Sequence, residues 1–331
     1  MTAKELETRN GSPLSGLCFG CMQFGGTADA IAAQAMFAAC RAVGINFFDT
    51  AHTYTGGQSE KMLGALVKAE ADDLMIATKA GYTGGSSREN ILQQFDGSRS
   101  RLGLDTVDIL YLHRWDPNTP LEETFEVLAR LQSDGKIRHI GVSNFAAWQV
   151  MKAQAVGERL GTRIDAIQPM YSLIKRQAEV ELFPMSLSEG IAGVPYSPLG
   201  SGLLTGKYGS NSPGSPVGRL STDKRYAARY AEPWMAQTAL SLLQLATEMG
   251  MHPATLAVAW AAGHPAVAAP IISARDASQL QPSLDAMRLD LCEETYSAVE
   301  ALSRRPAPAT DRLEESQKDT SSEVARAAGS A

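Results

Sequence analysis

The stretch D-T-A-H-T-Y, residues 49–54, decides how the rest of this chain can be interpreted. It follows a mainly apolar run, residues 45–48, that is short and rich in β-forming side chains and therefore predicts a buried strand. Asp49 then stands at the C-terminal end of this strand, and Tyr54 stands in the loop that leaves it. An acid and a phenol are thereby brought to one end of one strand.

The next two apolar runs also end on side chains that can carry chemistry. Residues 74–78 end at Lys79, and residues 107–112 end at His113. An acid, a phenol, an amine and an imidazole thus lie at or just after the ends of three successive predicted strands. In a barrel of parallel strands, catalytic residues gather at this C-terminal rim. We therefore expect the four side chains to form one site.

Strand and helix patterns alternate along the rest of the chain, after an N-terminal hairpin. Apolar runs predict strands over residues 16–20, 45–48, 74–78, 107–112, 139–142, 166–168, 191–195 and 270–272. Helices are predicted over residues 28–42, 58–68, 88–102, 121–133, 146–160 and 277–287. This alternation predicts an α/β fold of the (β/α)8 TIM-barrel type with long loops on its C-terminal face. We expect residues 1–304 to form the barrel and residues 305–331 to be a largely disordered tail.

The longest of these loops lies between Lys207 and Trp234 and is rich in Gly, Ser, Pro, Tyr and Arg. A loop of this length in a compact domain is commonly functional or disordered. We expect the walls of a substrate pocket to come from this loop and from residues 24–26, 82–86 and 115–118.

The composition excludes several classes of function. The chain has 331 residues with a net charge of -6, and an acidic balance argues against a nucleic-acid partner. No apolar stretch reaches membrane-spanning length, because residues 256–269 are interrupted by Gly263, His264 and Pro265. Residues 1–10 lack the apolar region of a secretory signal. We expect a cytoplasmic protein without a nucleic-acid or membrane partner, and its oligomeric state is open.

Cysteine usage agrees with a reducing compartment. The four cysteines are too scattered for a disulfide framework. Cys18 and Cys21 form a C-x-x-C, but they span a strand end and a Gly-rich loop, with no second cysteine or histidine pair nearby to complete a zinc site. We interpret them as small core residues and predict no metal site.

The four side chains at the rim suit the delivery of a proton to a carbonyl oxygen. Tyrosine holds its proton up to a pH of about 10, and a nearby ammonium such as that of Lys79 lowers the pKa of the phenol. Asp49 would hold the lysine and keep it charged. A neutral His113 could hydrogen-bond a substrate oxygen and fix its orientation. Another agent would deliver a hydride to the carbonyl carbon.

Five stretches, in order and with their spacing, resemble the aldo-keto reductase family: G-I-N-F-F-D-T-A-H-T-Y, M-I-A-T-K, D-I-L-Y-L-H-R-W-D, G-K-I-R-H-I-G-V-S-N-F and Y-S-P-L-G-S-G-L-L-T-G-K-Y. The resemblance covers about residues 10–290. It implies that Tyr54 is the general acid, that Lys79 and Asp49 tune it, and that His113 orients the substrate. It also implies a nicotinamide cofactor, mostly NADPH, bound across the barrel mouth without a Rossmann fold.

The resemblance assigns cofactor contacts by position. Ser143, Asn144 and Gln168 would hold the carboxamide, and Tyr196 would stack on the nicotinamide ring. The remaining contacts would be Gly20, Cys21 and Met22 at the ribose, Ser197, Leu199, Ser201 and Lys207 at the pyrophosphate, and Ser273, Arg275, Gln279 and Ser283 at the adenosine end. Ser273 departs from the usual glycine or lysine, and Pro282 with Ser283 replaces an acidic-Asn pair.

The sequence agrees with a cofactor site of this kind. No G-x-G-x-x-G follows the first predicted strand, where a Rossmann domain needs it. Residues 200–207 fail as a Walker A motif, because Ser201 replaces the first glycine and Tyr208 replaces the Ser or Thr. Such a Gly-rich loop can still bind a pyrophosphate through its N–H groups or be a flexible turn.

The function predicted is NADPH-dependent reduction of an aldehyde or ketone, with sugar-derived carbonyl compounds among the candidate substrates. One alternative is a cofactor-sensing regulatory subunit of the same fold, similar to the β-subunits of potassium channels. A second is an isomerase or aldolase on the same barrel that uses Lys79 as a Schiff base.

Overall fold

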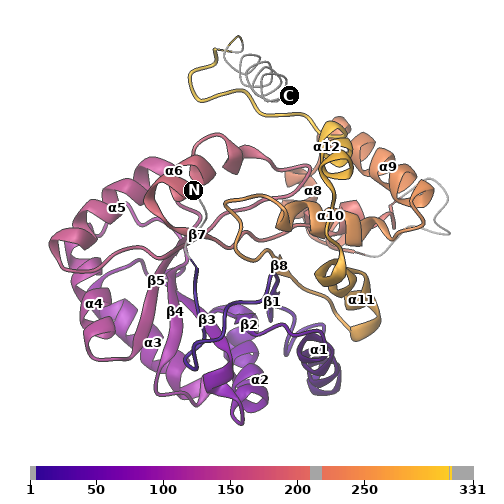
Figure 1. Ribbon diagram of the computed structural model, residues 1–331. Helices are drawn as coiled ribbons and strands as arrows, with labels where there is room; N and C mark the ends of the chain where they lie inside the picture. The colour runs from indigo at the N-terminus through magenta and orange to yellow at the C-terminus, as the bar shows by residue number, and fades with distance from the viewer. Residues whose placement is uncertain (1–4, 209–217, 313, 315–331) are drawn as a thin grey trace.

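The computed structural model describes residues 5–208, 218–312 and 314, and its strands form one parallel sheet (Figure 1). The sheet has eight strands in the order β7-β6-β5-β4-β3-β2-β1-β8. They are β1 (Cys18–Gly20), β2 (Phe47–Asp49), β3 (Met75–Ala80), β4 (Val107–Leu112), β5 (Ile137–Ser143), β6 (Ala166–Gln168), β7 (Ala192–Gly193) and β8 (Ile271–Ile272). Parallel bridges from Gly193 to Val267 and from Tyr196 to Ile271 join the two edges of the sheet. The predicted (β/α)8 barrel is confirmed.

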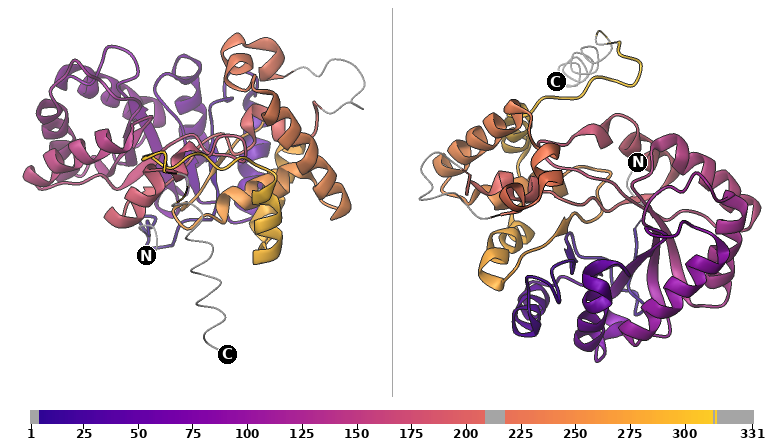
Figure 2. Two further views of the ribbon diagram at one scale, coloured as in Figure 1. Left: turned by 90° about the horizontal axis from the view of Figure 1, so that it is seen from above. Right: turned by 180° about the vertical axis from the view of Figure 1, so that it is seen from behind.

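The helices lie outside the sheet, as Figure 2 shows from two further sides. They are α1 (Ala30–Ala42), α2 (Gln58–Val67), α3 (Arg88–Leu102), α4 (Leu121–Ser133), α5 (Ala147–Arg159), α6 (Leu182–Glu189), α7 (Arg219–Thr222), α8 (Lys224–Arg229), α9 (Pro233–Glu248), α10 (Pro253–Ala262), α11 (Ala277–Asp285) and α12 (Glu293–Ala301). Helices α7 to α10 all belong to the connection between β7 and β8. This connection carries the long loop that the sequence singled out.

Helix α3 shows why some elements are predicted to the residue. The Ser87 side chain accepts a hydrogen bond from the Asn90 N–H, so it caps the first turn. Gly103 ends the helix in the left-handed region, with φ of 65°, where glycine is favoured. A strong start signal and a strong stop signal therefore enclose the apolar pattern.

The structure also corrects several sequence expectations. Helices α6, α9, α10 and α12 were not predicted, and two short helices, α7 and α8, occupy part of the long loop. Strand β7 covers two residues instead of the predicted 191–195. The N-terminal hairpin is a tight reversal with a single antiparallel bridge from Glu7 to Pro13. Most of the predicted tail, residues 305–331, and residues 209–217 of the long loop lie outside the described residues.

Apolar side chains pack on both sides of the sheet. Inside the barrel, one cluster joins strand residues such as Phe47, Met75 and Tyr111 to Leu6 of the N-terminal reversal. Gly141 on β5 makes room there, because a Cβ at this position would lie 2.3 Å from the Tyr111 ring. Two further clusters fill the space between the sheet and its surrounding helices. The strands are thus buried on both faces, as parallel strands require.

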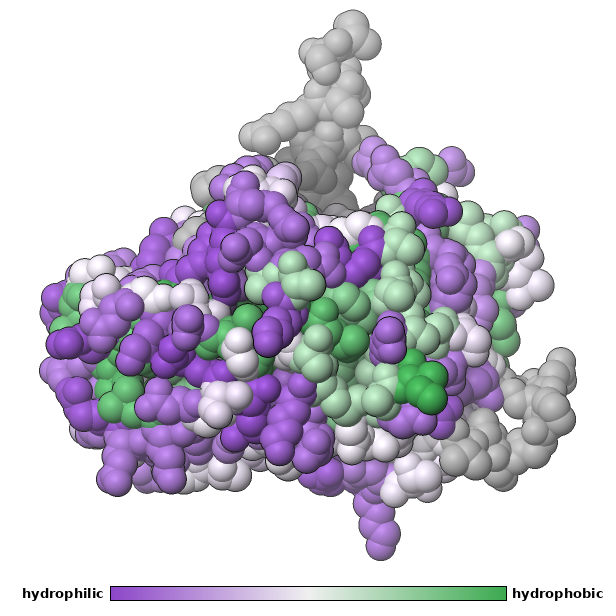
Figure 3. All heavy atoms as spheres, turned by 90° about the horizontal axis from the view of Figure 1, so that it is seen from below, coloured by the Kyte–Doolittle hydropathy of each residue, from purple (hydrophilic) through white to green (hydrophobic). Residues whose placement is uncertain are grey.

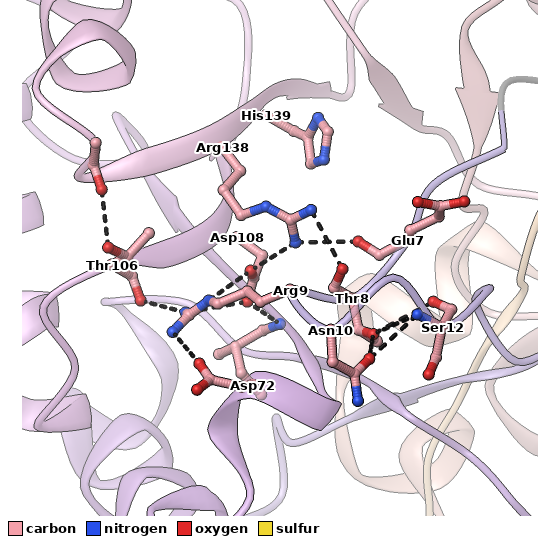
Figure 4. Close-up of polar contacts among 12 residues, drawn as sticks. Glu7, Thr8, Arg9, Asn10, Ser12, Asp72, Thr106, Asp108, Arg138 and His139 are labelled. Carbon is pink, nitrogen blue, oxygen red and sulfur yellow. Dashed lines mark hydrogen bonds and ion pairs between the residues drawn. The ribbon is translucent and has the colours of Figure 1, made fainter.

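The N-terminal segment is tied to the bottom of the barrel by charged residues (Figure 4). Asp108 of β4 is fully buried and accepts hydrogen bonds from Arg9 Nε at 3.0 Å, Arg138 Nη1 at 3.1 Å and the Ile76 N–H at 2.9 Å. Arg138 Nη1 also donates to the Glu7 carbonyl at 3.0 Å. This cluster of Arg9, Asp108 and Arg138 fixes the N-terminal segment across the strands at the opposite end from the predicted site.

The underside of the molecule carries both polar and apolar residues. Figure 3, which looks at the underside of the molecule in Figure 1, shows hydrophilic residues with an apolar region among them. Helix α1 lies on this side and exposes Ile31, with 81% of its surface accessible. Among the described residues, no helix combines the length and the apolar character that crossing a bilayer requires.

Candidate active site

A buried ion pair forms the floor of the predicted site. The Lys79 Nζ donates hydrogen bonds to Asp49 Oδ1 and, at 2.8 Å, to the Thr50 carbonyl. Lys79 has no exposed surface, and Asp49 is 2% exposed. The second carboxylate oxygen of Asp49 accepts a hydrogen bond from Gln168 Nε2 at 2.9 Å. Adjacent strands β2 and β3 supply the acid and the amine. The amide comes from β6, whose Gln168 side chain reaches across the barrel.

Tyr54 lies beside this pair, and His113 lies beside Tyr54. Lys79 Nζ lies 5.0 Å from the centre of the Tyr54 ring. The rings of Tyr54 and His113 meet edge to face with their centres 5.9 Å apart. Thr55 holds the loop of Tyr54, because its hydroxyl donates to the Phe24 carbonyl at 2.7 Å. The four side chains predicted at three strand ends are therefore brought into one cluster.

The cluster sets the protonation state of its members. Burial opposes the charge on Lys79, but Asp49 and Tyr54 outweigh it and raise the pKa of the ammonium. Burial, with a smaller contribution from Lys79, lowers the pKa of His113 to about 3. Near pH 7 the lysine is charged and the imidazole is neutral, as predicted.

Tyr54 differs from the expectation in one respect. Burial of the phenol raises its pKa, and the charge of Lys79 offsets this only in part. The predicted lowering of the pKa by Lys79 is present, but it is smaller than the effect of burial, because the sequence did not show how deeply the hydroxyl lies. Tyr54 is therefore firmly protonated near pH 7, which is the state that a proton donor needs.

A chain of hydrogen bonds connects four predicted cofactor contacts. The Tyr196 hydroxyl donates to Asn144 Oδ1 at 2.7 Å, and Asn144 Nδ2 donates to Ser143 Oγ at 3.0 Å. Ser143 Oγ then donates to the Gln168 carbonyl at 3.0 Å. Asn144 Nδ2 also reaches the His113 carbonyl at 3.0 Å. The residues expected around a nicotinamide ring thus form one network that borders His113 and Asp49.

Backbone strain is concentrated in the same region. Asn144, Ser197 and Ser201 have φ values of 58°, 63° and 56°, which side chains other than glycine rarely adopt. Each such residue costs on the order of 1–3 kcal/mol and persists where the surrounding structure enforces it, often at a ligand site. All three are among the residues that the family resemblance assigns to the cofactor.

The residues predicted at the phosphates and adenosine lie around the mouth. Lys207 Nζ lies 4.9 Å from the centre of the Tyr208 ring and close to the Gly202 backbone. Exposed Arg275 is held by Gln279, whose Oε1 accepts from the Arg275 N–H at 2.9 Å. Leu199 and Ser201 are half-buried in the turn before Lys207.

The other predicted contacts are more enclosed. Gly20 and Cys21 are buried and Met22 is half-buried at the end of β1, and burial raises the pKa of the Cys21 thiol well above its usual range. Cys18 and Cys21 are free thiols in the core, as expected of an inert pair. Ser283 is 2% exposed on the face of α11 that packs inward with Leu280 and Leu284. Ser283 therefore has little surface to offer to an adenine.

The site has features that a nicotinamide dinucleotide would satisfy. Ser273 Oγ and His113 Nδ1 are buried polar atoms without a hydrogen-bond partner among the described residues. Buried polar groups in native proteins are nearly always paired, so these atoms suit a ligand. Together with the strained Gly-rich turn at residues 200–202 and the cation of Lys207, the residues present fit the cofactor that the sequence predicts.

Some residues of the site were not assigned this role from the sequence. Gln168 was expected at the cofactor, but its side chain donates to Asp49. The Tyr82 ring lies 4.9 Å from the His113 ring, and Tyr226 of α8 is near enough to raise the pKa of Tyr54. The position of Tyr82 just after β3 is a signal in the sequence, whereas nothing in the pattern places Tyr226.

A cavity of about 590 Å³ lies elsewhere, between the starts of β5 and β6, where Arg138, His139 and Asp165 line it. Its cations are already engaged, since Arg138 pairs with Asp108, and Arg163 donates to the Glu189 and Gly190 carbonyls. None of the four predicted catalytic residues lines it. The cluster around Tyr54 therefore remains the candidate active site.

Eight parallel strands with this polar cluster at their carboxyl ends define an α/β barrel protein with a candidate active site, and comparison with known proteins specifies its family. The Aldo/keto reductase family model matches residues 16–304. The chain belongs to this family. Membership implies an oxidoreductase, and the family generally uses NAD(P)H.

Relatives with different names are similar in sequence to this chain. A probable voltage-gated potassium channel subunit beta from Oryza sativa is 33% identical over 89% of this chain and 94% of its own length. The L-glyceraldehyde 3-phosphate reductase of Escherichia coli is 31% identical over 74% of this chain and 75% of its own length. An aflatoxin B1 aldehyde reductase member 2 from Rattus norvegicus is 37% identical over 60% of this chain and 56% of its own length.

Proposed function

We propose that this protein reduces an aldehyde or ketone to an alcohol with NADPH and that Tyr54 is the general acid. The observation that carries the proposal is the protonated Tyr54 phenol between a charged, fully buried Lys79 and a neutral His113. The names of two relatives, an aldehyde reductase and a glyceraldehyde phosphate reductase, support an aldehyde as substrate.

Each residue has a role that follows from its surroundings. Tyr54 gives its proton to the carbonyl oxygen, and Lys79 stabilises the phenolate that remains. Asp49 holds Lys79 in place, and Gln168 fixes the second oxygen of Asp49. His113, being neutral, hydrogen-bonds the substrate oxygen without competing for the proton. The nicotinamide, when bound, supplies the hydride.

The preference for NADPH rests on the cations at the mouth. Lys207 and Arg275 would hold phosphate groups, and the planar guanidinium of Arg275 can grip a phosphate with two parallel hydrogen bonds. Ser273 and Gln279 stand beside Arg275 and would contribute further donors. Ser143, Asn144 and Tyr196 would hold the nicotinamide end.

A turnover assay tests the proposal. Purified protein is incubated with NADPH and a panel of small aldehydes, and loss of NADPH absorbance is followed for the wild type and Tyr54→Phe. Reduction by the wild type that is lost in the variant supports the assignment. Equal rates in the two proteins would remove Tyr54 from the mechanism.

Specific observations favour one alternative function and disfavour another. Similarity to a probable channel β-subunit over 89% of this chain keeps a cofactor-sensing role as the second candidate. Tight NADPH binding with negligible turnover across the aldehyde panel would favour it. A Schiff-base role for Lys79 is disfavoured, because the amine is charged and paired with Asp49, whereas a nucleophilic lysine must be neutral.

A further inference from the structure

Two arginines at the barrel mouth form no direct ion pair within the described chain. Arg114 follows His113 directly and is exposed, and Arg229 is the exposed last residue of α8. Neither guanidinium takes part in an ion pair among the described residues, although arginines such as Arg88 and Arg159 on the helical surface do. The protein as a whole is acidic, so cations without a counter-ion beside a candidate active site need a reason.

Arg114 is connected to the catalytic imidazole through one aromatic ring. Its Cζ lies 4.9 Å from the centre of the Tyr82 ring, and that ring lies 4.9 Å from the ring of His113. Tyr82 is 43% exposed, so this stack leads from the site to the surface. An arginine lying on a ring keeps its N–H groups at its edge, where a ligand can reach them.

Arg229 is also stacked on an aromatic ring, that of Tyr226. Its Cζ lies 5.1 Å from the centre of the Tyr226 ring. Tyr226 is near enough to Tyr54 to raise the pKa of that phenol, and Arg229 acts to lower the pKa of Tyr196. Helix α8 therefore brings a cation to the mouth from the long connection, while Arg114 comes from the end of β4.

Two acids that lie close to these arginines in the sequence already hold other groups. Asp116 accepts hydrogen bonds from the Ser86 N–H at 2.8 Å and the Thr119 hydroxyl at 2.7 Å. Asp223 pairs with Arg225 at 2.9 Å and caps α8. Both carboxylates are thereby committed to holding loops and helix ends. Arg114 contributes to the lowered pKa of Asp116 without forming an ion pair with it, and both guanidinium groups remain exposed.

We propose that the mouth selects carbonyl substrates that carry an anionic group, a carboxylate or a phosphate, which Arg114 and Arg229 bind while the carbonyl faces Tyr54 and His113. This inference rests on the proposed reductase function and deepens it. Because one aromatic ring separates each arginine from the catalytic residues, the anion stands only a few carbon atoms from the carbonyl. Guanidinium groups bind both anions with paired, charge-assisted hydrogen bonds.

Matched substrates test the proposal in the full-length protein. Succinic semialdehyde is compared with its methyl ester, and glyceraldehyde 3-phosphate with glyceraldehyde, each by kcat/KM with NADPH. We expect the anionic member of each pair to be preferred at least tenfold by the wild type. A larger preference in one pair than in the other tells whether the carboxylate or the phosphate is the better fit.

Variants of the arginines complete the experiment. Arg114→Gln and Arg229→Gln should each reduce the preference for the anionic member about tenfold, and Arg114→Lys should retain part of it. Arg159→Gln, an exposed arginine on α5, should leave the preference unchanged. The wild-type preference should also fall as salt is raised.

The possible failures are distinguishable. Equal kcat/KM for the charged and neutral members, or equal losses for both in the arginine variants, overturns the anion site and leaves the reductase intact. Failure of the wild type to reduce any of the four compounds overturns the proposed function together with this inference.

Discussion

The barrel holds a buried carboxylate at each of its two ends, and the two are surrounded very differently. At the bottom, Asp108 faces the guanidinium groups of Arg9 and Arg138, which are 22% and 29% exposed and also bind backbone carbonyls (Figure 4). At the top, Asp49 faces Lys79, which has no exposed surface and whose next neighbour is the Tyr54 ring. Both carboxylates are well paired, so burial and pairing alone do not separate structure from chemistry.

The two ends differ in the groups that surround the cations paired with each carboxylate. Every hydrogen bond shown for Arg9 and Arg138 ends on an acceptor that has no proton to give. Lys79 instead stands beside a phenol that carries a transferable proton, and around that phenol lie a neutral imidazole and strained backbone. The bottom cluster contains only groups that hold the chain together, whereas the top cluster contains the groups that the proposed proton transfer needs. Substitutions at the two ends should therefore damage different properties.

The largest effect is expected at the top. Tyr54→Phe should lower kcat by on the order of 10²–10⁴, the usual contribution of a positioned acid, while NADPH binding survives. Lys79→Met should do comparable damage to kcat, because an unassisted buried phenol is a poor acid. Steady-state kinetics measures kcat, and circular dichroism checks that the variants are folded. Tyr296→Phe on α12 is the matched control, and a near-normal kcat in Tyr54→Phe would contradict the comparison.

At the bottom we expect a loss of stability without a loss of chemistry. Asp108→Asn leaves two arginines facing a neutral amide, which should cost roughly 3 kcal/mol, the low end for a broken buried pair because the arginines are partly exposed. Urea unfolding measures this cost. Asp72→Asn removes a 79% exposed partner of Arg9 and should cost less than about 0.5 kcal/mol. A lower kcat per folded molecule of Asp108→Asn would contradict this prediction, because it would show that Asp108 contributes to catalysis.

Sequence reasoning succeeded where the signals are local. The strands that end at or near Asp49, Lys79 and His113, and the stop of α3 at Gly103, are visible within a few residues of the chain. Helix α10 was missed because nearly every residue in it is buried, so it has no polar face and no helical period to detect. Helix α8 was missed because it has six residues in a Gly- and Ser-rich loop.

The parts of the site that escaped prediction depend on tertiary contacts. Gln168 meets Asp49 across 119 residues of sequence, and no pattern encodes that hydrogen bond. The sign of the pKa shift of Tyr54 depends on how deeply its hydroxyl lies, which only the folded chain determines. The cofactor contacts followed from family resemblance and stay predictions.

A smaller, pH-dependent effect should also separate the two ends. The pKa of His113 falls from 6.5 to about 3 on folding, so between these values the unfolded chain binds a proton that the folded chain does not. Stability is therefore complete above about pH 6.5 and is lost as the pH falls, by about 2 kcal/mol at pH 5. His113→Asn should lose correspondingly less stability between pH 7 and pH 5 in urea unfolding. Parallel losses in the two proteins would show that His113 titrates normally.

The smallest effect compares arginines at the two ends. Arg275 is exposed, has the neutral Gln279 as its hydrogen-bond partner and takes part in no ion pair within the described residues, whereas Arg9 and Arg138 are both paired with Asp108. Arg275→Ala should therefore leave stability unchanged within about 0.5 kcal/mol, since little in the protein depends on its charge. It should weaken NADPH binding about five- to tenfold, because one charge-assisted contact to a phosphate is lost, and should affect NADH binding far less.

Fluorescence titration of both cofactors measures the two affinities. Arg138→Ala is the comparison variant, which we expect to lose stability and to retain the preference for NADPH. Equal weakening of NADPH and NADH in Arg275→Ala would mean that the extra phosphate is held by other residues, with Lys207 the next to replace.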